Sequence, residues 1–164
     1  MKTLFLVRHA KSSWSDATLA DRERPLARRG RRAARRMGRR LAKRTLRPDL
    51  MLSSPALRAL KTAGLMARKL QHPRRRIEVD DTLYASPLTA LVRRVRALDE
   101  RYARVMMFGH NPQIAQLVRH FSGRVAPMPT CAVACLTFAA NAWTDVGPQT
   151  LLRVEFDYSQ KNPT

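Results

Sequence analysis

The chain contains few cysteines, and this shortage excludes a disulfide scaffold. Only Cys131 and Cys135 occur among 164 residues, too few for the bridges that staple small secreted proteins. They lie four positions apart in an apolar stretch, without the further His or Cys ligands that a metal pair would need. We therefore expect buried, reduced thiols, and no metal or other cofactor is implied.

Long apolar runs are also missing. The first run, Leu4 to Val7, is too short and wrongly flanked for a secretory signal or a membrane span. We expect a cytoplasmic protein without membrane contact. A chain of this length can bury a substantial core without disulfides or metal, so we expect one domain over residues 1–158 and a flexible tail over 159–164.

Acidic residues are scarce, with 12 Asp and Glu against 32 Lys and Arg, which gives a net charge of +20. Such an excess raises the question of nucleic-acid binding. The densest basic segment, 28–44, also carries an apolar stripe at helical spacing: Gly30, Ala33, Ala34, Met37, Gly38, Leu41 and Ala42. We interpret it as a packed helix with a solvated face. Base-stacking aromatics do not interleave with its arginines, which argues against nucleic-acid binding as the main role.

Strand-length apolar runs alternate with amphipathic segments, a pattern typical of an α/β domain with a mostly parallel sheet flanked by helices. The alternation predicts strands at 3–7, 49–53, 77–79, 104–108, 132–138 and 150–156. It predicts helices over 26–44, 55–70, 87–98 and 112–121. Because no repeat or linker divides the chain, a single three-layer domain follows.

Three polar motifs each follow a predicted strand. Arg8 and His9 end the first strand, Ser53, Ser54 and Pro55 end the second, and Gly109, His110, Asn111 and Pro112 end the fourth. Open α/β sheets bind ligands beyond the carboxyl ends of their strands. We therefore expect Arg8, His9, Arg58 and His110 to meet in one site.

The two Pro-containing motifs resemble helix starts, with Ser54 and Asn111 as N-caps and the prolines in the first helical position. Two helix N-termini would then favour an anion such as a phosphoryl group. Arg58, one turn into its predicted helix, would reach the same anion. Arginine forks match phosphate oxygens and hold the charge of a transferring phosphoryl group.

The histidines differ in context. Positive charge from Arg8 and Arg58 would keep His9 neutral, as attack on phosphorus requires, whereas His110 would donate hydrogen bonds to the phosphoryl oxygens. His72 and His120 have no matching context, and we expect them to be surface or partly buried structural residues.

At this point a resemblance is apparent. The segment from Leu6 to Trp14 resembles the start of the SixA-type phosphohistidine phosphatases, in the phosphoglycerate mutase-like histidine phosphatase superfamily. Further matches are Asp21 to Leu26 with Gly30, Ser53 to Ala59 with Thr62, Gly109 to Pro112, and Pro129 to Ala132. The resemblance implies a phosphatase active in signal transduction, with His9 as nucleophile and Arg8, Arg58 and His110 around the phosphate.

Two departures from the superfamily pattern bear on the substrate. Ala10 replaces the usual Gly after the nucleophile, which is tolerated if that backbone needs no positive φ. No carboxylate lies in the segment Leu83 to Ser86, where larger members carry a general acid, although Asp80 and Asp81 precede it. A phosphoramidate needs such an acid less than an ester does. The preferred substrate is therefore a protein-borne phosphohistidine.

The remaining predictions concern substrate contacts and alternatives. Ser12, Ser15 and Asn111 are candidate substrate-binding residues, and the basic surface would attract an acidic partner protein. One alternative is a phosphatase or mutase for small phosphomonoesters, which a carboxylate donor near Tyr84 would favour. Another is a catalytically silent, basic nucleic-acid or signalling module, against which the intact Arg8, His9, Arg58 and His110 argue.

Overall fold

The computed structural model describes residues 1–159, so the predicted tail lies outside the described residues except for Ser159. Its sheet consists of β1 (Lys2–Arg8), β2 (Leu50–Ser53), β3 (Ile77–Val79), β4 (Arg104–Gly109), β5 (Val133–Phe138) and β6 (Leu151–Asp157). Its α-helices are α1 (Arg28–Lys43), α2 (Leu57–Lys69), α3 (Thr82–Ala85), α4 (Leu88–Arg96) and α5 (Gln113–Ser122). Four short 3-10 helices are η1 (Asp21–Glu23), η2 (Arg74–Arg76), η3 (Trp143–Asp145) and η4 (Pro148–Thr150).

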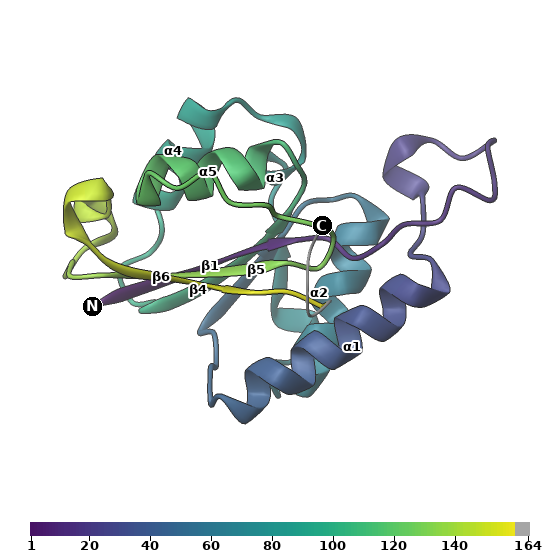
Figure 1. Cartoon of the computed structure of the whole chain (residues 1–164), viewed down its shortest axis with the longest axis horizontal. Coiled ribbons are helices and arrows are strands. Elements are labelled where there is room, and N and C mark those ends of the chain that lie inside the picture. Colours follow the sequence, from purple (N-terminus) through teal and green to yellow (C-terminus); the bar gives the residue numbers. More distant parts are fainter. Residues whose placement is uncertain (160–164) are drawn as a thin grey trace.

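The strand order is β3-β2-β4-β1-β5-β6. Strands β3, β2, β4 and β1 pair in parallel, whereas β5 runs antiparallel to both of its neighbours. Helices α1 and α2 cover one face of this sheet, and α3, α4 and α5 cover the other (Figure 1). The mostly parallel, three-layer α/β architecture expected from the sequence is confirmed.

Burial on both faces explains why β1 is apolar without alternation. Leu4 and Leu6 belong to the core cluster that includes residues of α4 and α5. Phe5 and Val7 belong to a second cluster, which they share with residues of α1 and α2. The sheet is therefore held from both sides, and the carboxyl end of β1 is fixed in position.

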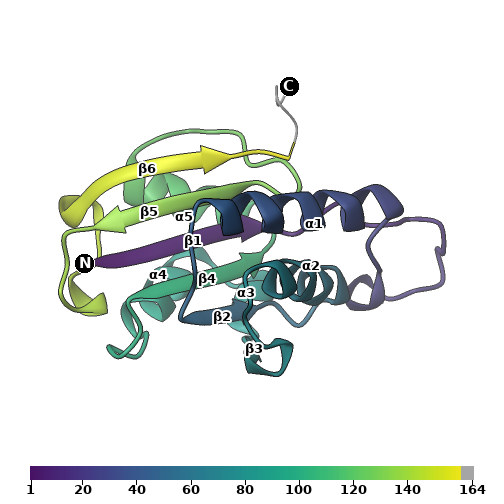
Figure 2. The same ribbon diagram turned by 90° about the horizontal axis from the view of Figure 1, so that it is seen from below.

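Helix α1 buries the predicted stripe against α2 and the sheet, with arginines left exposed around it. It begins at Arg28 rather than at residue 26, because Leu26 forms an isolated antiparallel bridge with Ser12. The loop from Lys11 to Ala27 thus returns to the end of β1 before α1 starts. Seen from below, this loop projects beyond the sheet edge at which β1 ends (Figure 2).

The starts of α2 and α5 were predicted wrongly. The N-cap of α2 is Ala56 and that of α5 is Pro112, and neither helix has a side-chain cap. The Ser54 hydroxyl accepts a hydrogen bond from the Ala56 N–H, ahead of the first helical residue, and also contacts His110. As a result Arg58 lies in the first turn of α2 rather than one turn inside it.

Both cysteines are buried and free, as expected, and burial raises the pKa of Cys131 to about 12. His72 is half-buried and His120 is exposed, as predicted for histidines outside the site. Within residues 1–159 no helix combines the length and apolar character needed to cross a membrane.

Candidate active site

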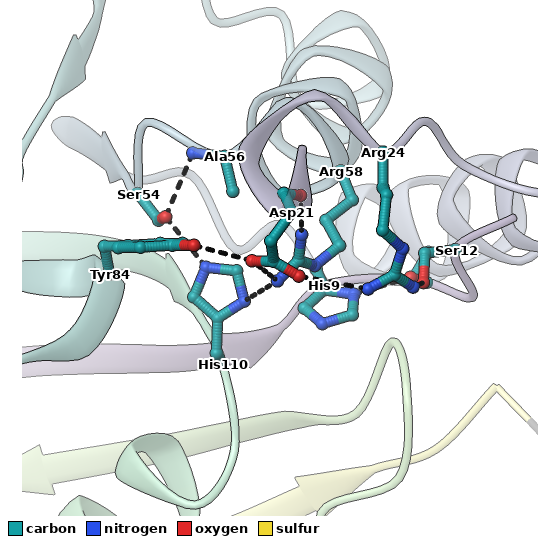
Figure 3. Close-up of polar contacts among 10 residues, drawn as sticks. His9, Ser12, Asp21, Arg24, Ser54, Ala56, Arg58, Tyr84 and His110 are labelled. Atoms are coloured by element: carbon teal, nitrogen blue, oxygen red, sulfur yellow. Dashed lines mark hydrogen bonds and ion pairs between the residues drawn. The ribbon is translucent and has the colours of Figure 1, made fainter. Parts of the chain in front are cut away.

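Polar side chains follow the carboxyl ends of three parallel strands and lie at one edge of the sheet. His9 follows β1, Ser54 follows β2, and His110 follows β4. Arg58 enters from α2, and Asp21 enters from the loop that precedes α1 (Figure 3). The rings of His9 and His110 lie 5.0 Å apart, centroid to centroid. The expected meeting of these histidines with Arg58 is therefore observed.

His9 is held in one tautomer. Its Nδ1 lies 2.7 Å from the Ala10 carbonyl oxygen, an atom that can only accept, so Nδ1 carries the proton. The unprotonated nitrogen is consequently Nε2. Burial lowers the pKa of His9 to about 4, and the charges of Arg58, Arg8 and Arg24 act in the same direction, against the Ala10 carbonyl. His9 is thus neutral near pH 7, with its Nε2 lone pair available.

His110 is held in the opposite tautomer. Its Nδ1 faces an Arg58 Nη2 at 3.4 Å, and since a guanidinium has only donors, Nδ1 accepts. Nε2 then carries the proton and donates to the Ser54 hydroxyl at 2.8 Å. Burial lowers the pKa of His110 to about 3, with further contributions from His9 and Arg58. An anion placed between the histidines would reverse this trend and favour a protonated His110.

The two arginines provide positive charge beside His9. Arg58 is almost fully buried, with 7% of its surface exposed. Arg8 donates from Nη1 to the Met128 carbonyl at 3.2 Å. The Nε of Arg8 is buried and has no hydrogen-bond partner among the described residues.

Asp21 was missed as a site residue by sequence reasoning. Its Oδ2 accepts bonds from Arg58 Nη2 at 3.0 Å and from the Tyr84 hydroxyl at 2.6 Å. Its Oδ1 lies 3.2 Å from Arg24 Nη1. The Tyr84 bond lowers the pKa of Asp21 to about 2, helped by Arg58 and Arg24. The only sequence signal is its place at the start of the segment from Asp21 to Leu26, which resembles the superfamily but does not by itself indicate a role for Asp21.

Arg24 and Tyr84 were also missed, and both surround the same carboxylate. Arg24 is buried, donates to the Ser12 hydroxyl at 2.5 Å and stacks its guanidinium on the Trp14 ring. Tyr84 lies in α3, a helix that sequence reasoning did not predict, and packs edge-on against the His110 ring. The site is therefore enclosed by the loop before α1 on one side and by α3 on the other.

The three predicted substrate-binding residues are placed differently from one another. Ser12 is buried and hydrogen-bonded to Arg24. Ser15 is exposed, and its hydroxyl pairs with that of Ser13. The Asn111 amide donates to the Met128 carbonyl, and its oxygen accepts from the Ala115 N–H. Ser12 therefore contacts the site residue Arg24, and Asn111 holds the loop that contains Met128. Contact of Ser12, Ser15 or Asn111 with substrate stays a prediction.

Ala10 fits its position as predicted. It does not adopt a positive φ, so its Cβ causes no backbone strain. Its N–H donates to the Thr62 hydroxyl at 3.0 Å, and that hydroxyl donates to the Arg58 carbonyl at 2.7 Å. Thr62 therefore links the backbone of Ala10, the residue after His9, to the backbone of Arg58 through one side chain.

Comparison with known proteins identifies the family. The sequence model of the histidine phosphatase superfamily (branch 1) matches residues 4–85. An uncharacterised protein of Mycobacterium tuberculosis is 30% identical over 161 residues, covering 92% of this chain and 98% of that protein.

Solved structures agree with the sequence match. A protein assigned as the phosphohistidine phosphatase SixA of Agrobacterium tumefaciens is 27% identical, with a TM-score of 0.75 over 84% of this chain and 92% of that one. The protein histidine phosphatase SixA complexed with tungstate is 26% identical, with a TM-score of 0.77 over 95% and 94% of the two chains. The chain therefore belongs to the histidine phosphatase superfamily, in its branch 1, and is a phosphatase of that family.

Proposed function

We propose that the chain removes the phosphoryl group from a phosphohistidine carried by another protein, through a phosphohistidine intermediate on His9. The observation that carries the proposal is the tautomer of His9, whose Nδ1 proton is engaged by the Ala10 carbonyl. A lone pair on Nε2 beside Arg58 and His110 is suited to attack on phosphorus. SixA proteins are the structural relatives at 26–27% identity, which supports the same substrate class here.

In the first step, Nε2 of His9 forms a bond to phosphorus while the bond from phosphorus to the substrate nitrogen breaks. The other ring nitrogen of the substrate imidazole takes a proton from solvent, so the ring leaves as neutral imidazole. The phosphoryl charge is held by Arg8, Arg58 and a protonated His110. In the second step, water attacks the phosphorus of phospho-His9. Inorganic phosphate is released and the His9 lone pair is restored.

The nature of the leaving group supports a phosphoramidate. An alkoxide needs a proton donor, which commonly contributes 10²–10⁴-fold to the rate. Asp21 is the carboxylate bonded to both Arg58 and Tyr84, and with a pKa of about 2 it is ionised near neutrality. It accepts hydrogen bonds in this state and holds no proton to give. The second ring nitrogen of a phosphorylated imidazole is itself a base, so a proton from solvent makes the ring a neutral leaving group without a donor from the enzyme.

The small-phosphomonoester alternative is favoured by one observation. A carboxylate does lie beside Tyr84, because Asp21 Oδ2 accepts the Tyr84 hydroxyl proton. Once a phosphoryl group neutralises Arg58, that carboxylate would become more basic and could then donate a proton to an ester oxygen. Activity measured on a phosphoprotein and on a small ester distinguishes the two functions.

The test measures phosphate release from a phosphohistidine-bearing phosphotransfer protein and from an aryl phosphate ester, with wild type and His9→Ala. We expect the wild type to prefer the phosphoprotein and His9→Ala to lose both activities. His120→Ala is a matched control, since His120 is an exposed histidine outside the site. Preference for the ester would support the alternative, and activity on neither substrate would contradict both.

A further inference from the structure

A basic cleft lies beside the active site. It has a volume of about 390 Å³, and its lining includes Lys11, Arg29, Arg32, Arg36 and Thr130. Within the described part of the chain, no acidic residue lines it. The three arginines occur at positions i, i+3 and i+7 of α1 and so share one helix face. They extend over about 10 Å along the helix axis.

The four cations of the cleft, Lys11, Arg29, Arg32 and Arg36, lie together without a partner among the described residues. Within residues 1–159, none of the four forms an ion pair or a side-chain hydrogen bond. Farther along α1, Arg40 pairs with Asp157, and Arg44, the residue just after the helix, pairs with Glu155. Like charges held together without a counter-ion repel one another. The arrangement therefore favours an anionic ligand from outside the chain.

Two residues that line the cleft lie close to His9 along the backbone. Lys11 follows Ala10, the residue whose carbonyl fixes the His9 tautomer. Thr130 precedes Cys131, whose N–H donates to the His9 carbonyl at 3.0 Å. Lys11 and Thr130 are thus each the chain neighbour of a residue that is hydrogen-bonded to His9. A ligand whose phosphoryl group reaches His9 will also approach the cleft.

Several features favour a protein surface over a small anion or a nucleic acid. A single phosphate is too small to contact a row of cations about 10 Å long. Among residues 1–159, no aromatic side chain lines the cleft, so bases would find nothing there to stack on. Trp14, three residues after Lys11, is 72% exposed beside the site, and an exposed tryptophan at a functional edge is typical of a protein interface.

We infer that this cleft is the docking site for an acidic surface of the phosphoprotein substrate, with carboxylates of that surface paired to Arg29, Arg32, Arg36 and Lys11. The inference rests on the proposed function for the identity of the substrate. Its contribution is to association, because complementary charges raise the rate of encounter and align the partners. The cleft would leave the chemical step at His9 unchanged.

The test compares two charge-reversed variants. Arg29→Glu with Arg32→Glu alters the cleft, and Arg35→Glu with Arg39→Glu makes the same change in charge on exposed residues of α1 that do not line it. The substrates are a phosphotransfer protein with an acidic surface and a small N-phosphorylated imidazole. At low salt, we expect the cleft variant to lower kcat/KM on the protein by about tenfold or more relative to the control variant. Both variants should leave kcat/KM on the small substrate within about twofold of wild type.

Ionic strength and binding provide further readouts. Raising the salt to about 0.5 M should remove most of the difference between the variants on the protein substrate. The unphosphorylated phosphotransfer protein should bind more weakly to the cleft variant than to the control, and this measurement does not depend on catalysis. A wild type inactive on both substrates that still binds through the cleft would contradict the proposed function and support the docking site.

Three outcomes would overturn the docking site. One is an equal loss for the two variants, which would show an effect of net charge alone. Another is an equal loss on both substrates, which would show damage to the catalytic residues. The third is tighter binding of a single-stranded RNA than of the acidic protein, with the RNA binding lost in the cleft variant.

Discussion

Arg58 forms two hydrogen bonds to Asp21, one from Nη1 to its backbone carbonyl at 2.7 Å and one from Nη2 to its carboxylate at 3.0 Å. The pair joins the start of α2 to the loop before α1 across 37 positions of sequence. It fixes the Arg58 guanidinium beside His110, at the cost of placing a negative charge near the phosphoryl site. Asp21 therefore positions Arg58 and also competes with the substrate for it.

Replacement of Asp21 by Asn separates positioning from proton donation. The amide oxygen still accepts from Arg58, so we expect kcat/KM to fall by about tenfold or less on both substrates, the loss of one charge-assisted bond. A general acid would behave differently, because its loss would reduce ester hydrolysis by about 10²–10⁴-fold and spare the phosphoramidate. Steady-state kinetics of Asp21→Asn on both substrates decides between them, and a selective loss on the ester would favour the small-molecule function.

The sequence predicted the convergence of Arg8, His9, Arg58 and His110 because strand ends determine it. Parallel strands bring their carboxyl ends to one edge whatever the loops do. The contact of Asp21 with Arg58 depends instead on the path of the loop from Lys11 to Ala27, which no periodic pattern encodes. The capping prediction at Ser54 failed because α2 begins only at Leu57, with Ala56 as its N-cap. The Ser54 hydroxyl binds the Ala56 N–H ahead of the helix and also contacts His110.

The titration of the two histidines gives a second prediction. With pKa values of about 4 for His9 and about 3 for His110, both rings should stay neutral down to about pH 5. Imidazole resonances followed by NMR should show no protonation of either ring near pH 6.5. Arg58→Gln removes a charge that lowers both pKa values, so both should rise in that variant. Titration of both rings near pH 6.5 in the wild type would contradict the assigned environment.

Stability should depend on pH for the same reason. Each histidine has a folded pKa below its ordinary value of 6.5, so the unfolded chain binds more protons between the two values. The free energy of unfolding is therefore fully retained above pH 6.5 and falls as the pH drops toward 4. The slope is at most about 1.4 kcal/mol per pH unit for each histidine. Urea unfolding of wild type and of His9→Gln with His110→Gln should show a smaller decline in the variant over this range.

Thr62 offers a test of the link between the backbones of Ala10 and Arg58. Thr62→Val keeps the shape of the side chain but leaves the buried Ala10 N–H without its acceptor. We expect a loss of about 1–3 kcal/mol in the free energy of unfolding. Because the same change frees the backbone beside His9, kcat should fall more than KM changes. Thr62→Ser, which retains the hydroxyl, should recover most of the activity; no recovery would show that packing of the methyl group matters instead.

Gly30 and Gly64 are both buried glycines in helices, but they differ in what surrounds them. A Cβ on Gly30 would lie 2.1 Å from the Lys11 carbonyl oxygen, which is backbone fixed by its bond to the Ala27 N–H. A Cβ on Gly64 would meet the end of the Arg74 side chain, which can move aside. We expect Gly30→Ala to cost about 1–3 kcal/mol of unfolding free energy. Gly64→Ala should be close to neutral, because the gain of up to about 1 kcal/mol in helix propensity offsets the contact.

Since Lys11 lies two residues after His9, the Gly30→Ala variant should also lose activity, measured alongside its thermal unfolding. An unchanged melting temperature in Gly30→Ala would mean that the loop from Lys11 to Ala27 moves readily. In that case the Arg58 contact with Asp21 would be easily displaced by substrate, and Asp21→Asn should then raise the affinity for inorganic phosphate instead of only weakening catalysis.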